Sequence, residues 1–140
     1  MKFKKLLMSL ALALLVVPML TACGPTVVDV KLKTYIILLD KNSAPAGEIT
    51  FHVHNDATDI THEFAIVKTD LPQNALPTNE DSTINEQADG ITIIDRVELG
   101  VGEAQDLTVN LEPGNYVFVC NIGGDELHYA HGMHTAFTVE

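Results

Sequence analysis

The chain has 140 residues, with 8 Lys and Arg against 19 Asp and Glu, and its formal net charge is −11 at pH 7. An acidic surplus of this size argues against binding to nucleic acid or to anionic lipid head groups, and it favours a positively charged protein partner. The length suits a single domain with a core of its own.

The first 22 residues have the order of a secretory signal. Three lysines lie within Met1–Lys5, the segment Leu6–Leu20 is almost wholly apolar, and small residues precede Cys23. The apolar segment is shorter than the roughly 20 residues that a membrane-spanning helix needs. We therefore predict that residues 1–22 are a signal peptide that is removed on export.

The junction Leu20-Thr21-Ala22-Cys23 resembles a bacterial lipobox. The resemblance implies cleavage before Cys23 and attachment of lipid to its thiol, so that residues 23–33 become a lipidated N-terminus and tether. An ordinary signal peptide with an incidental cysteine is the alternative. Because two or three acyl chains anchor a protein stably where one does not, we expect a membrane-anchored protein on the periplasmic or extracellular face of a bacterial cell.

Short strands separated by turns account for most of the remaining chain. Apolar or alternating segments predict strands at residues 35–39, 49–55, 63–67, 91–99, 105–111, 116–120 and 135–139. Turn residues fill 43–47 and 112–115, and the segment 71–90 is predicted to be a long loop with one helical turn around Thr83–Gln87. Seven such strands predict an all-β, Greek-key β-sandwich of seven to eight strands over residues 34–140.

The strand at residues 49–55 has the clearest period of two. Phe51 and its apolar neighbours lie on one face, and His52 and His54 lie on the other. We expect the two histidines to be solvent-exposed, and a second metal site involving them is the alternative.

The two cysteines have different expected roles. If lipid modifies Cys23, then Cys120 is the one cysteine left, and an internal disulfide is excluded. A free exposed thiol is a liability in an oxidising compartment. The cysteine count therefore favours a metal-bound thiolate at Cys120.

The segment 120–139 contains the most specific motif. A strand ends at Cys120, His128 follows in a loop, Met133 comes five residues later after a glycine, and the next strand begins at once. This order resembles the copper-binding loop of the cupredoxins, the blue copper proteins. Upstream, His62 follows a strand that ends in Asn55, which is similar to the position of the family's other histidine.

The resemblance implies one copper ion that cycles between Cu(I) and Cu(II). Its ligands would be His62, Cys120, His128 and Met133. A thiolate and two imidazoles in a trigonal arrangement, with a weak axial thioether, are typical of blue-copper electron-transfer sites. In the family, the exposed edge of the loop histidine passes the electron, so we expect an exposed edge at His128.

The motif differs from the family pattern in its loop. Cys120 and His128 are eight residues apart, and Gly123–Glu126 has the character of a short insertion, which is expected to expose or loosen the site. His131 is an alternative ligand to His128, but it lies only two residues before Met133.

Two neighbouring residues also matter. Glu63 stands where the family often has Asn after the upstream ligand; its backbone N–H can still face the cysteine sulfur, but a side-chain lock across the loops becomes doubtful. His134 is expected to point away from Met133.

Two functions remain open on this basis. The first is a membrane-anchored one-electron carrier, monomeric, whose partner is a redox protein such as a cytochrome or an oxidase. The second is a copper-delivery lipoprotein without redox cycling, which the extra histidines and the long loop suggest. We do not expect an enzyme, because copper enzymes of this fold need further domains and a second copper centre.

Overall fold

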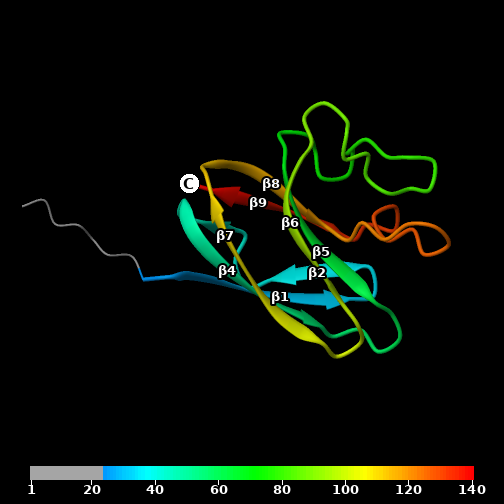
Figure 1. Ribbon diagram of the computed structural model, residues 1–140, viewed down its shortest axis with the longest axis horizontal. Coiled ribbons are helices and arrows are strands. Elements are labelled where there is room, and N and C mark those ends of the chain that lie inside the picture. Colours follow the sequence, from blue (N-terminus) through cyan, green and yellow to red (C-terminus); the bar gives the residue numbers. More distant parts are fainter. Residues whose placement is uncertain (1–23) are drawn as a thin grey trace, which may run out of the picture.

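The computed structural model describes residues 24–140, which fold into two packed β-sheets (Figure 1). The strands are β1 (Thr26–Lys33), β2 (Ile36–Leu39), β3 (Ser43–Ala44), β4 (Gly47–Asn55), β5 (His62–Lys68), β6 (Thr92–Leu99), β7 (Ala104–Leu111), β8 (Gly114–Val119) and β9 (His134–Val139). One sheet has the order β2-β1-β4-β7 and the other β3-β9-β8-β5-β6. The predicted all-β sandwich is confirmed, with nine strands. Within residues 24–140 no helix is long and apolar enough to cross a membrane.

The tether predicted at residues 23–33 is wrong from Thr26 onward. These residues form β1, which pairs in parallel with β4. Val28, Val30 and Leu32 are at most 1% exposed in the core, and polar residues alternate with them. The alternation is a strand signal that the mixed composition obscured. The predicted signal peptide and Cys23 lie outside the described residues.

Two further local predictions differ from the structure. Ser43–Ala44, predicted as part of a turn, forms β3 and pairs in parallel with β9 at a sheet edge. Residues 83–87 form no helical turn. Ile84 pairs with Thr78 in an isolated β-bridge, and a turn follows in which the Gln87 N–H donates to the Asn85 side chain and the Ala88 N–H donates to the Asn85 carbonyl. An asparagine side chain that bonds the backbone two residues on stabilises a turn in place of a helix.

Four phenylalanines pack at the centre of the sandwich. Phe51 comes from β4 in one sheet, and Phe64, Phe118 and Phe137 come from β5, β8 and β9 in the other. The Phe51 and Phe118 ring centroids are 5.1 Å apart at 80°, an edge-to-face contact across the two sheets. This aromatic core fixes the spacing of β5 and β8, and His62 and Cys120 lie at the ends of these two strands.

The long loop at residues 71–90 covers the outer face of β5 and β8. Leu76 and Ile84 from this loop are buried in a second core cluster with Val67, Val119 and Tyr129. This explains why residues 62–67 are buried on both faces, although a strand at a sandwich surface usually alternates. In Figure 1 the loop lies at the same end of the sandwich as the segment between β8 and β9.

Candidate metal centre

Three sequence-predicted residues meet at one end of the sandwich. His62 is the first residue of β5, Cys120 follows the last residue of β8, and His128 lies in the segment that leads to β9. Because β5 and β8 are antiparallel neighbours in one sheet, the start of β5, with His62, and the end of β8, next to Cys120, lie at the same end of the sheet. All three residues are 0% exposed.

The donor atoms of these residues converge on one point. The Cys120 Sγ lies 3.0 Å from the His128 Nδ1 and 3.9 Å from the His62 Nδ1, and the two Nδ1 atoms are 3.2 Å apart. Among residues 24–140, no other group of three His, Cys, Asp or Glu side chains converges in this way. A single cation between the three atoms would bind all of them.

Met133 contacts this group through backbone hydrogen bonds. The Cys120 N–H donates to the Met133 carbonyl at 3.0 Å, and the Met133 N–H donates to the His128 carbonyl at 3.1 Å. Met133 is 0% exposed and packs in the same core cluster as Cys120. Its backbone is therefore hydrogen-bonded to two of the three converging residues.

Burial sets the protonation state of the group. It lowers the pKa of His62 to about 4, together with the charge of the nearby His128, and it also lowers the pKa of His128. Burial raises the pKa of the Cys120 thiol to about 12, although the backbone amides of Glu63 and Ile122 oppose the rise. At neutral pH both imidazoles are therefore neutral and able to bind a metal, and the thiol keeps its proton until a cation displaces it.

The donor set fits copper. Two imidazoles and one thiolate also suit zinc, but a thioether is a soft ligand that favours copper and is found as the weak axial ligand of blue-copper sites. Met133 is the one methionine in the sequence beyond residue 22, and its position beside Cys120 and His128 suits that role.

Solved structures of blue copper proteins are similar to this chain over 84% of its length. Reduced auracyanin from Roseiflexus castenholzii is 26% identical with a TM-score of 0.62, and 99% of that chain is covered. Auracyanin A from Chloroflexus aurantiacus, a "blue" copper protein, is 19% identical with a TM-score of 0.60, and all of that chain is covered. Rusticyanin from Thiobacillus ferrooxidans is 20% identical with a TM-score of 0.57 and 79% covered. No family model and no curated protein matches the sequence.

The chain has the cupredoxin fold. Its buried histidines, cysteine and methionine form the kind of cluster that is typical of a type 1 site. The family resemblance inferred from the segment 120–139 is therefore confirmed.

The loop insertion covers the site. The His128 Nε2 lies 3.1 Å from the Glu126 carboxylate, and the Tyr35 ring packs edge-on at 5.4 Å from the His128 ring. The expectation of an exposed His128 edge is wrong, because the inserted residues and Tyr35 cover the imidazole completely. Within the loop, the His128 N–H donates to the Ile122 carbonyl.

The remaining histidines of residues 24–140 lie outside the converging group. His131 is exposed and packs on Tyr35 at 4.6 Å, so the geometry selects His128 over His131. His134 packs against a tyrosine ring, and burial lowers its pKa. His52 and His54 are each 46% exposed and pair with the carboxylates of Asp106 and Asp56, respectively, on the solvent face of β4.

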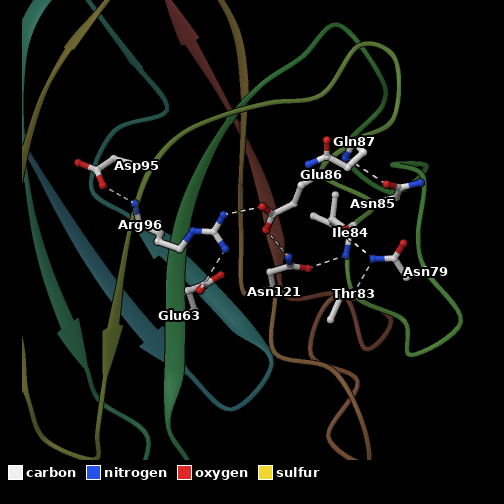
Figure 2. Close-up of polar contacts among 10 residues, drawn as sticks. All are labelled: Glu63, Asn79, Thr83, Ile84, Asn85, Glu86, Gln87, Asp95, Arg96 and Asn121. Atoms are coloured by element: carbon white, nitrogen blue, oxygen red, sulfur yellow. Dashed lines mark hydrogen bonds and ion pairs between the residues drawn. The ribbon is translucent and has the colours of Figure 1, made fainter.

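Sequence reasoning missed a set of polar residues beside the ligands. They are Arg96 on β6, Glu86 in the long loop and Asn121 after the cysteine, and Arg96 joins them to the side chain of Glu63 (Figure 2). One signal was available: Arg96 is the only arginine in the sequence. Partners so far apart in the chain have no sequence spacing that would connect them.

Proposed function

We propose that this protein binds one copper ion in a type 1 site and carries single electrons. The proposed ligands are His62, Cys120, His128 and Met133. The convergence of two Nδ1 atoms and one Sγ from three buried side chains carries the proposal. Copper supplies the change between Cu(I) and Cu(II) when bound. The chain holds the donors on strand ends and a hydrogen-bonded loop and excludes water, so they move little when the charge of the metal changes.

A spectrum of the purified protein loaded with Cu(II) tests this function. A thiolate bound to Cu(II) in a trigonal site gives an intense charge-transfer band in the visible range, and the proposal expects that band to disappear on reduction and return on oxidation. A colourless protein, or the spectrum of a tetragonal Cu(II) site, would rule out the type 1 assignment.

Burial of the donors favours the carrier over copper delivery. Delivery requires an ion that leaves readily for an acceptor, whereas His62, Cys120 and His128 are 0% exposed and Glu126 caps His128. We expect the copper to remain bound for hours in an excess of chelator. Loss within minutes, in a protein that still shows the charge-transfer band, would support delivery.

Anchoring and location belong to the same proposal. The sequence supports a signal peptide at residues 1–22, lipid on Cys23, and a folded domain that begins at β1 on the outer side of a bacterial membrane. Fractionation of cells that express the full chain tests this. The natural chain is expected in the membrane fraction, and a Cys23→Ala variant is expected to lose lipid and the membrane association.

The proposed redox partner is a protein with a positive docking surface, such as a cytochrome or an oxidase. Asp59 and Glu126 lie close enough to His62 for their charges to act on its pKa, so carboxylates lie near the site itself. Attraction of this kind raises association rates and is screened by salt. Electron transfer to a basic partner should therefore slow as ionic strength rises.

Copper uptake should release about one proton per ion at neutral pH, and its apparent affinity should rise about tenfold per pH unit. The proton comes from the Cys120 thiol, whose pKa burial raises to about 12. His62 and His128 contribute none, because burial lowers both of their pKa values and leaves them neutral. Titration calorimetry in buffers of different ionisation enthalpy measures the number. A value near zero would mean that the Cys120 thiol loses no proton when copper binds, and it would exclude Cys120 as a thiolate ligand.

A further inference from the structure

Four side chains form a connected polar group next to the metal centre (Figure 2). Arg96 donates to the Glu86 carboxylate at 2.8 Å and lies 3.7 Å from the Glu63 carboxylate. The Asn121 side chain donates to the other oxygen of Glu86 at 3.2 Å. We call Glu63, Arg96, Glu86 and Asn121 the polar clamp.

The polar clamp connects segments that are distant in the sequence. Glu63 directly follows the proposed ligand His62, and Asn121 directly follows the proposed ligand Cys120. Arg96 comes from β6, and Glu86 comes from the long loop. The Asn121 side-chain oxygen also accepts the Ile84 N–H at 2.6 Å, which anchors the long loop a second time. The clamp therefore connects the residues that follow both ligands: Glu63 lies against the guanidinium group directly, and Asn121 is linked to it through Glu86.

The burial of the Glu63 carboxylate explains the need for a cation beside it. The Glu63 side chain is 12% exposed, and one of its oxygens is buried without a hydrogen-bond partner. Removing the only cation beside a buried carboxylate leaves an uncompensated charge, which costs far more than the loss of an exposed ion pair. Arg96 is 38% exposed and has a planar fork of donors that a lysine lacks, which suits a residue placed between two carboxylates.

The clamp acts on the cysteine through the backbone of Glu63. The Glu63 N–H donates to the Cys120 Sγ at 3.1 Å. We propose that the polar clamp is a positioning device that keeps this N–H on the sulfur and keeps the Cys120 side chain directed at the metal. It takes the place of the asparagine lock whose absence the sequence suggested. The inference rests on the proposed function, which it deepens.

A hydrogen bond to the sulfur has a predictable effect on bound copper. It withdraws electron density from the thiolate, so the thiolate stabilises Cu(II) less than it otherwise would. The reduction potential is therefore higher with the bond than without it. Loss of the clamp should lower the potential and should shift and weaken the charge-transfer band.

Substitution of Arg96 tests the clamp in the copper-loaded protein. Arg96→Gln should weaken copper binding on the order of 10-fold, the lower end of what losing a partner of a metal ligand costs, and should lower the reduction potential. Arg96→Lys keeps the charge without the planar fork of donors. Its copper affinity and reduction potential should lie between those of Arg96→Gln and those of the natural chain. Lys68→Gln is the matched control, because Lys68 pairs with Glu112 at the end of β5 that is farther from Glu63. It removes the same charge and should change neither property.

A measurement without metal separates failure of the clamp from failure of the proposed function. In a Cys23→Ser background, Cys120 is the only thiol. Arg96→Gln should increase its labelling rate by a thiol reagent on the order of 10-fold, because the loop around the buried thiol opens more often. Glu86→Gln breaks the same ion pair with an amide of equal size and should increase the labelling rate in the same way. It serves as the test if Arg96→Gln folds poorly.

Two results would overturn the clamp. One is an unchanged labelling rate and an unchanged spectrum in both Arg96→Gln and Glu86→Gln. The other is an equal change in Lys68→Gln, which would show that only the net charge matters. If the natural chain binds no copper but Arg96→Gln still speeds labelling, the proposed copper function fails and the clamp stands as a device that holds Cys120.

Discussion

Replacing Cys120 with serine abolishes the charge-transfer band and weakens copper binding by at least about 100-fold. That bound is set by comparison, because losing a residue that only hydrogen-bonds a ligand already costs about 10–100-fold. The hydroxyl that takes the place of the sulfur is harder and far less acidic than a thiol, so it does not supply a thiolate-like donor. Visible absorption and copper titration measure the two effects.

The matched control is Cys23→Ser, which makes the same chemical change at the other cysteine and should leave the band intact. Serine at position 120 also places a hydroxyl in a fully buried position, at a cost of about 1–3 kcal/mol in the free energy of unfolding. A Cys120→Ser protein that stays folded and keeps the band would eliminate Cys120 as a ligand.

Gly123→Ala has the second largest expected effect, because there is no room for a side chain there. A Cβ at this position would lie 2.4 Å from the Thr83 methyl carbon and 2.8 Å from the Asp81 carbonyl oxygen. The second neighbour is backbone and cannot rotate away. We expect a loss of about 1–3 kcal/mol in the free energy of unfolding, as for other overpacked sites, together with faster loss of copper to a chelator.

Adding Thr83→Ser to Gly123→Ala distinguishes a steric cause from other effects. The double variant removes the methyl group but keeps the hydroxyl that donates to the Asp81 carboxylate. Stability and copper retention should recover in part, because the contact with the Asp81 carbonyl remains. Thermal unfolding and chelator challenge measure both. If Gly123→Ala equals the natural chain in both measurements, the long loop does not brace the ligand loop.

The long loop shows where sequence reasoning reached its limit. Proline content and the absence of a period correctly predicted a loop at residues 71–90, but they did not predict its role. The loop donates the Leu76 N–H to the Tyr129 hydroxyl and the Ile84 N–H to Asn121, so it is hydrogen-bonded to the ligand loop. These partners lie 53 and 37 residues apart in the chain, and no local pattern links them.

The failure at β1 has a different cause. Its alternation is present in the sequence, but the mixed composition of the segment obscures it and favours a tether. The parallel pairing with β4, which buries Val28, Val30 and Leu32, depends on a strand about 20 residues further along. A short strand of mixed composition is decided by its neighbours in the sheet.

The sequence by itself determined the fold class and the four residues proposed to bind copper. It could do so because strand periodicity is local, and because Cys120, His128 and Met133 lie within one loop whose order is specific. Only the tertiary structure decided that His128 and not His131 contacts the cysteine, and that Glu126 and Tyr35 cover the His128 ring. It also decided that Arg96 lies beside Glu63, next to the site. Burial and charge pairing depend on segments that meet only after folding, so local spacing carries no record of them.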